Sequence, residues 1–173
     1  ALPLVWVKVF SDIQRNRFLA LFYPESYSDI IYQQLQAKNA IGSGQLTGQG
    51  LFKGPYTQNN VVPEAQNDMI LAVICEELGV FGVLVLLTMF GILLHRLMDI
   101  AKKAPDRYGA LIVTGIFAHI ALQVILNVAV VLNVIPTTGI TLPFISYGGT
   151  SMLFLMAEMG LALSVSNRIE FDE

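Results

Sequence analysis

The sequence predicts an all-α fold, a polytopic bundle of transmembrane helices. Apolar residues make up 54% of the 173 residues and charged residues only 13%, whereas soluble domains average about 45–50% and about 25%. The charges are also segregated, because Lys, Arg, Asp and Glu are absent from residues 78–94, 108–157 and 159–167. So few charges do not cover a solvated surface, and this distribution indicates a membrane protein.

Residues 1–10 read as the last turns of an apolar helix that is too short to cross a bilayer. We expect them to be the end of a truncated transmembrane helix, so that the chain is a fragment of a larger protein. Residues 11–68 follow as a long extracytoplasmic loop.

Three later segments are long and apolar enough to span the membrane, since a crossing helix needs about 20 mostly apolar residues. They are residues 69–94, 108–135 and 148–165. The connection 95–107 carries four basic residues, which is typical of a cytoplasmic loop: Arg96, Lys102, Lys103 and Arg107. The connection 136–147 has none and is predicted to be extracytoplasmic, which makes residues 166–173 a cytoplasmic tail.

Other function classes are disfavoured by the charge and the cysteine count. The net charge of −3 offers no basic excess for nucleic acid. Cys75 is the single cysteine, which excludes an internal disulfide framework and a cysteine-based zinc site.

Polar residues inside the predicted spans have two interpretations. Glu76, Glu77 and Glu158 are acids within apolar runs, and an intramembrane acid is by default a functional hypothesis. The alternative for Glu158 is a structural hydrogen bond to a residue of the second span. That span offers three polar residues spaced four apart, on one helix face: His119, Gln123 and Asn127.

Two carboxylates, Glu64 and Asp68, precede the first full span. If the helix has begun by Glu64, they share one face near its N-terminus. They are then either a helix cap with a solvated acid, or a general base or metal ligand at the lipid–water boundary.

Two small-residue segments lie on the same predicted side of the membrane. Residues 42–50 begin Gly42-Ser43-Gly44 and form either a mobile loop or a cradle of backbone amides for phosphate, although they lack the Gly-Lys-Ser/Thr ending of a P-loop. The outer connection either re-enters the membrane or makes a tight exposed turn. Its candidate substrate-binding residues are Thr137, Thr138, Ser146, Tyr147, Gly148 and Gly149.

Five motifs between about residues 36 and 168 resemble the SEDS family of bacterial cell-wall polymerases, which includes FtsW, RodA and SpoVE. They are Ala40-Ile41-Gly42-Ser43-Gly44, Pro63-Glu64-Ala65 with Asp68, Glu76-Glu77-Leu78-Gly79, Ala104-Pro105-Asp106-Arg107, and Pro136-Thr137-Thr138-Gly139 continuing to Ser146-Tyr147-Gly148-Gly149.

The resemblance implies the C-terminal half of a multi-pass peptidoglycan glycosyltransferase of the bacterial cytoplasmic membrane. Such an enzyme polymerises lipid II during division, elongation or sporulation, with inversion and with undecaprenyl pyrophosphate as the leaving group. The family's essential acid falls on Asp68, the expected general base. Lys38, Lys53 or a divalent metal (Mg or Mn, held by Asp68 and Glu64) would balance the charge of the departing diphosphate.

The resemblance also implies a class B penicillin-binding protein and other division or elongation proteins as partners, and no nucleic acid. Two alternatives remain open: a flippase for the lipid-linked precursor, in which polar residues within the spans matter more than Asp68, and a scaffold without either activity. A polymerisation assay run beside a lipid-translocation assay distinguishes the three.

Overall fold

The structure, a computed structural model, describes residues 28–59 and 67–171. The helix predicted over residues 1–10, Glu64 and the end of the C-terminal tail lie outside the described residues. The part of the chain that is described is helical, and its helices are connected by turns and loops without a β-strand. They are α3 (Ser28–Gly44), α4 (Pro55–Gln58), α5 (Ile70–Lys103), α6 (Arg107–Val131) and α7 (Gly149–Phe171).

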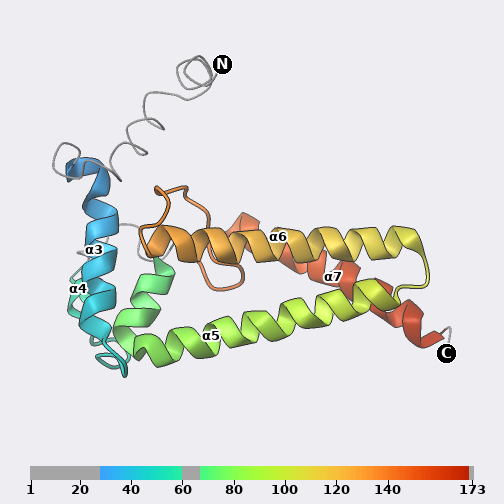
Figure 1. Ribbon diagram of the computed structural model, residues 1–173, viewed down its shortest axis with the longest axis horizontal. Coiled ribbons are helices and arrows are strands. Elements are labelled where there is room, and N and C mark those ends of the chain that lie inside the picture. Colours follow the sequence, from blue (N-terminus) through green and yellow to red (C-terminus); the bar gives the residue numbers. More distant parts are fainter. Residues whose placement is uncertain (1–27, 60–66, 172–173) are drawn as a thin grey trace, which may run out of the picture.

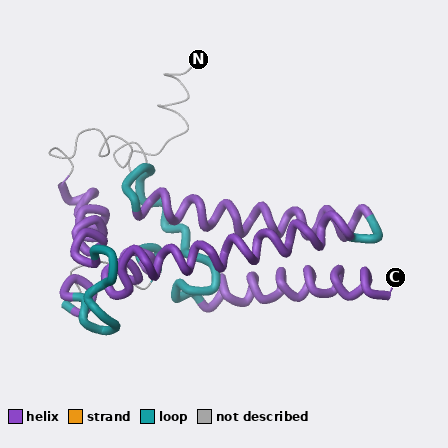
Figure 2. The backbone as a smooth tube through the Cα atoms, turned by 60° about the horizontal axis from the view of Figure 1, so that its bottom comes forward, coloured by secondary structure: helices purple, strands orange, loops and turns teal. Residues whose placement is uncertain are grey.

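Three of these helices, α5, α6 and α7, are long and apolar enough to cross a membrane. They lie side by side as a bundle, and α6 packs against both α5 and α7 (Figures 1 and 2). The 25 residues of α6 correspond to roughly 37 Å at 1.5 Å per residue, which exceeds the hydrocarbon thickness of a bilayer. The predicted all-α bundle with three full spans is thus confirmed.

The first span differs from its prediction because α5 is broken at Gly79. This residue has φ 70° and ψ −172°, which is not helical, and only glycine adopts this region readily. The turns before the break run beside α3, across the direction of the long helices, and the straight part of α5 follows the break (Figure 1). Glu76 and Glu77 therefore lie in the turns that precede the straight part, and the helix continues to Lys103.

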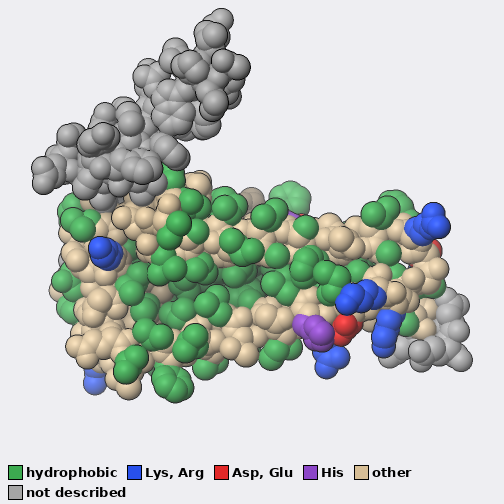
Figure 3. Space-filling model, in the orientation of Figure 1, with side chains coloured by type: hydrophobic (Ala, Val, Ile, Leu, Met, Phe, Trp, Pro, Cys, Tyr) green, Lys and Arg blue, Asp and Glu red, His purple; other side chains and the backbone are tan. Residues whose placement is uncertain are grey.

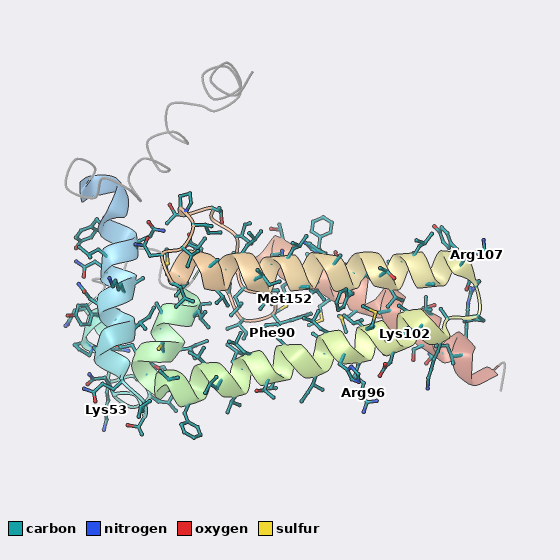
Figure 4. All side chains as sticks on the ribbon, in the orientation of Figure 1. Lys53, Phe90, Arg96, Lys102, Arg107 and Met152 are labelled. Carbon is teal, nitrogen blue, oxygen red and sulfur yellow. The ribbon has the colours of Figure 1, made fainter. Side chains whose placement is uncertain are left out.

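Basic residues gather where α5 ends and α6 begins. Figure 4 shows Arg96, Lys102 and Arg107 toward this end of the bundle, and Arg168 lies in the last turn of α7. The carboxylate of Asp106 caps α6 by accepting a hydrogen bond from the backbone N–H of Gly109 at 2.8 Å. These cations cluster at one end of an apolar bundle, and that this end is cytoplasmic stays a prediction.

Apolar side chains fill the centre of the bundle and also cover its outside. Val113, Ile120 and Leu97 are among the most deeply buried residues. Leu84, Leu153 and many others are exposed, and Figure 3 shows apolar side chains along the length of the bundle, with the charges gathered toward its ends. An exposed apolar surface of this extent is suited to contact with lipid or with further helices.

Candidate active site

Asp68 lies at the end of the bundle opposite the basic residues, in the turn that precedes α5. Helix α5 begins at Ile70, with Met69 as its N-cap, so Asp68 does not belong to the first helical turn. The prediction that Glu64 and Asp68 share one helical face depended on a helix that begins by residue 64. Asp68 lies before α5, and Glu64 lies outside the described residues. The Asp68 side chain is only 9% exposed, which is unusual for a carboxylate at a protein surface.

Asn127, near the outer end of α6, joins the Asp68 turn to the outer connection. Its Nδ2 donates to the backbone carbonyl of Asp68 at 2.9 Å and to that of Ile140 at 2.9 Å. The side chain is fully buried. The Asp68 turn and the outer connection are therefore held together by one amide group.

The outer connection re-enters the bundle instead of forming an exposed turn. Leu142 is 1% exposed, and Phe144 and Ile145 line an apolar cavity of about 330 Å³ together with residues of the straight part of α5: Leu86, Met89, Phe90 and Leu93. Irregular backbone at this depth requires hydrogen-bond partners within the protein. The structure provides them, since Gln34 Nε2 donates to the carbonyl of Ile135 at 3.0 Å and Asn127 to that of Ile140.

The small polar residues of this re-entrant connection have different environments. Ser146 Oγ accepts a hydrogen bond from the backbone N–H of Leu142 at 2.8 Å and so closes the turn around Phe144. Gly149 begins α7, and the carbonyl of Gly148, just before it, accepts from the N–H of Met152. The other three candidate residues lie within the connection: Thr137, Thr138 and Tyr147. Tyr147 is 79% exposed.

The glycine-rich segment packs against the broken part of α5. Gly44 lies so close to Cys75 that a Cβ would come within 1.9 Å of the Cys75 carbonyl oxygen. The backbone amides of Gln49 and Gly50 donate to the carbonyls of Glu76 and Glu77. These two amides are occupied, which favours a packing role over a phosphate cradle for this part of the segment. Ser43 Oγ donates to the carbonyl of Ala40 within its own helix, and Gly42 is exposed with open space around it.

The two lysines proposed for the diphosphate, Lys38 and Lys53, are both exposed. Lys38 lies on α3. Lys53 lies beside the bend in α5 (Figure 4), in the loop that pairs with Glu76 and Glu77. At 1.5 Å per residue, the level of Glu77 along α5 is roughly 13 Å from Asp68.

Glu76 has a structural partner that sequence reasoning missed. Its carboxylate is fully buried and accepts hydrogen bonds from the backbone N–H groups of Tyr56 at 2.8 Å and Thr57 at 3.0 Å, and from Thr57 Oγ1. It therefore caps the N-terminus of α4. The signal available in the sequence was Pro55 after Gly54, a typical helix start whose orphan N–H groups need an acceptor.

Glu158 makes the structural contact that was one of its two interpretations. Its Oε1 lies 2.9 Å from Nδ1 of His119, so α6 and α7 are joined by an interhelical ion pair or hydrogen bond. Gln123 and Asn127 lie on the same face of α6 but are not its partners.

The described residues provide no group of three or more His, Cys, Asp or Glu side chains that could hold a metal ion. Asp68 contributes one carboxylate, and Glu64 lies outside the described part. The described residues alone thus do not make a metal site, and no catalytic step is assigned to a metal.

Comparison with known families gives a match over nearly the whole chain. Residues 1–170 match the family described as "Cell cycle protein", which comprises FtsW, RodA and SpoVE. The chain is 36% identical over 167 residues to the peptidoglycan glycosyltransferase MrdB of Escherichia coli K12, covering 95% of this chain and 45% of MrdB. It is 45% identical over 136 residues to stage V sporulation protein E of Bacillus subtilis, covering 78% of this chain and 37% of that protein.

Two solved structures share this fold. One belongs to a peptidoglycan synthase complex in which polymerization and crosslinking are coordinated, with a TM-score of 0.74, 30% identity, and coverage of 95% of this chain and 44% of that chain. The other is an aspartate-to-alanine mutant of the rod shape determining protein RodA of Thermus thermophilus, with a TM-score of 0.57, 36% identity, and coverage of 73% and 38%. The chain spans less than half the length of these relatives.

Proposed function

Because the chain belongs to the FtsW/RodA/SpoVE family, we propose that it carries the catalytic carboxylate of a peptidoglycan glycosyltransferase that polymerises lipid II. It is a multi-pass membrane protein, and MrdB, one of its relatives, is a peptidoglycan glycosyltransferase. The observation that supports the proposal most directly is the position of Asp68, a largely buried carboxylate at the outer end of the bundle, beside the re-entrant connection.

In the proposed mechanism Asp68 is the general base. Its carboxylate takes the proton of the 4-hydroxyl group of the acceptor N-acetylglucosamine. That oxygen forms a bond to the anomeric carbon of the lipid-linked donor while the bond from this carbon to the pyrophosphate oxygen breaks. The electron pair leaves with undecaprenyl pyrophosphate, and attack from the opposite face inverts the anomeric configuration. A largely buried carboxylate suits this role, because a general base must lie within hydrogen-bond reach of the proton that it takes.

The departing diphosphate needs cationic compensation. Lys38 on α3 and Lys53 beside the bend in α5 would supply it if the substrate extends from Asp68 toward these elements. In the alternative, Asp68 and Glu64 would hold a divalent metal that would supply this charge. The partner proposed from the synthase complex is a class B penicillin-binding protein, which supplies the crosslinking step.

The test is Asp68→Asn in the full-length protein, assayed for polymerisation with purified lipid II. We expect loss of glycan strands with unchanged membrane insertion and thermal stability, because the amide keeps the shape of the side chain and cannot take up the proton. Asp99→Asn, at the basic end of α5, is the matched control and should polymerise normally.

A lipid-translocation assay on the same preparation distinguishes the proposed glycosyltransferase from the flippase alternative. Normal strand synthesis by Asp68→Asn would contradict the role of Asp68. If the unmodified protein translocates lipid II without polymerising it, the protein is a flippase and the proposed glycosyltransferase function is wrong.

A further inference from the structure

We infer that Asn127 is a positioning residue for the proposed base: it fixes the turn that carries Asp68 against the re-entrant connection and so sets where the Asp68 carboxylate lies. This inference rests on the proposed function. Asn127 touches neither reacting atom in this role and acts through the backbone of Asp68.

The geometry of the amide uses its full donor capacity. A carboxamide nitrogen carries two N–H groups, and Nδ2 of Asn127 makes two hydrogen bonds of 2.9 Å, one to the carbonyl of Asp68 and one to that of Ile140. A hydroxyl side chain has one donor and holds only one of these two segments. An aspartate at this position has no donor when ionised, and it presents oxygen to two carbonyl oxygens.

Asn127 is also placed where the contact is rigid. The side chain is 0% exposed, so water does not compete for the two carbonyls. Asp68 lies in a turn outside any helix, and Ile140 lies in irregular backbone, so neither segment is held by a helical hydrogen-bond ladder of its own. The α6 helix supplies the fixed frame from which both are held.

Among the described residues, the amide of Asn127 acts only as a donor. Oδ1 of Asn127 is buried and makes no hydrogen bond to the described residues. A buried unpaired acceptor is costly, and leucine, of similar volume, removes it. The loss of two donated bonds on Asn127→Leu is therefore partly offset, and the variant is expected to fold.

The experiment compares Asn127→Leu with Gln123→Leu in the full-length protein. Gln123 lies one turn earlier on the same face of α6 and also has a buried, unbonded amide oxygen, but it makes no bond to the Asp68 turn. The measurements are thermal stability, kcat and KM for lipid II, and the dependence of kcat on pH.

We expect kcat of Asn127→Leu to fall about 10- to 100-fold, as expected when a catalytic group is displaced by about 1 Å, with KM little changed. The acid limb of the kcat–pH profile, which reports the base, should also shift. Asn127→Gln, which keeps both donors, should recover part of the loss, and Gln123→Leu should stay within about threefold of the unmodified enzyme.

Equal kcat values and equal pH profiles for Asn127→Leu and Gln123→Leu would overturn the inference. If Asn127→Leu does not accumulate, Asn127→Ser, which keeps one donor, enters the same comparison and is judged by the same criteria. The Asp68→Asn variant, run in parallel, separates the two proposals. When it is inactive and Asn127→Leu is not impaired, only the positioning role fails; when Asp68→Asn polymerises normally, the proposed base fails and the positioning role with it.

Discussion

Gly48 and Gly79 lie against each other where the loop after α3 crosses the break in α5. A Cβ added to Gly79 would come within 2.4 Å of the backbone nitrogen of Gly48, and both residues have positive φ, 78° and 70°. The loop also pairs with the helix ends at the break: the N–H groups of Val80 and Phe81 donate to the carbonyls of Gln45 and Leu46 at 3.1 and 3.2 Å. The loop thus replaces the helical hydrogen bonds that the break removes, and the bend is a built feature of the fold.

Gly79→Ala should therefore destabilise the protein strongly. The mirror-extended conformation alone costs an alanine about 1–3 kcal/mol, and the clash with Gly48 adds to it. Gly91→Ala is the control, because Gly91 has open space around it in the straight part of α5, and alanine favours a helix. Thermal unfolding of the full-length protein in detergent measures both. Equal melting temperatures for the two variants would mean that the bend is not rigid.

Glu76→Gln should lower stability without removing the proposed base. The buried carboxylate accepts three hydrogen bonds from Tyr56 and Thr57, and an amide replaces one accepting oxygen with a donor, so we expect a loss of about 1–3 kcal/mol. Glu77→Gln is the matched control, since the Glu77 side chain makes no hydrogen bond within the described part of the chain. Thermal unfolding and limited proteolysis of residues 50–59 compare the stability of Glu76→Gln with that of Glu77→Gln. Equal stability of the two variants would mean that Glu76 does not cap α4.

The pair His119–Glu158 should stabilise the packing of α6 on α7 and leave polymerisation nearly unchanged. In a double-mutant cycle to alanine we expect a coupling of about 0.6 kcal/mol, the average for interhelical hydrogen bonds in a membrane. The exposed pair His95–Asp99, 3.4 Å apart within α5, should couple less. Loss of lipid translocation in the His119 and Glu158 variants, with normal polymerisation, would instead support the flippase alternative.

Chelation should reduce polymerisation if a divalent metal supplies the charge that the departing diphosphate needs. We expect EDTA to lower kcat and added Mg²⁺ or Mn²⁺ to restore it. Glu64→Gln should raise the metal concentration needed for half-maximal activity, whereas Asp68→Asn should stay inactive at every concentration. Full activity in EDTA would exclude the metal and leave the lysines as the source of charge.

The helical fold and the three candidate spans could be predicted from the sequence because both depend on local composition. Mostly apolar runs of about 20 residues form helices in lipid, and the structure has three helices of this kind. His119 could be predicted as one of three possible partners of Glu158, because helical spacing places the polar residues of the second span on one face.

The break at Gly79, the capping by Glu76 and the two bonds of Asn127 were decided by the tertiary structure. Each joins residues far apart in the chain: 59 positions separate Asn127 from Asp68, and 20 separate Glu76 from Tyr56. A glycine, a glutamate and an asparagine in an apolar run each fit several roles, and helical periodicity does not choose among them. The choice depends on which backbone groups lose their partners when the helix bends and the outer connection re-enters, because those buried groups must find donors or acceptors elsewhere in the fold.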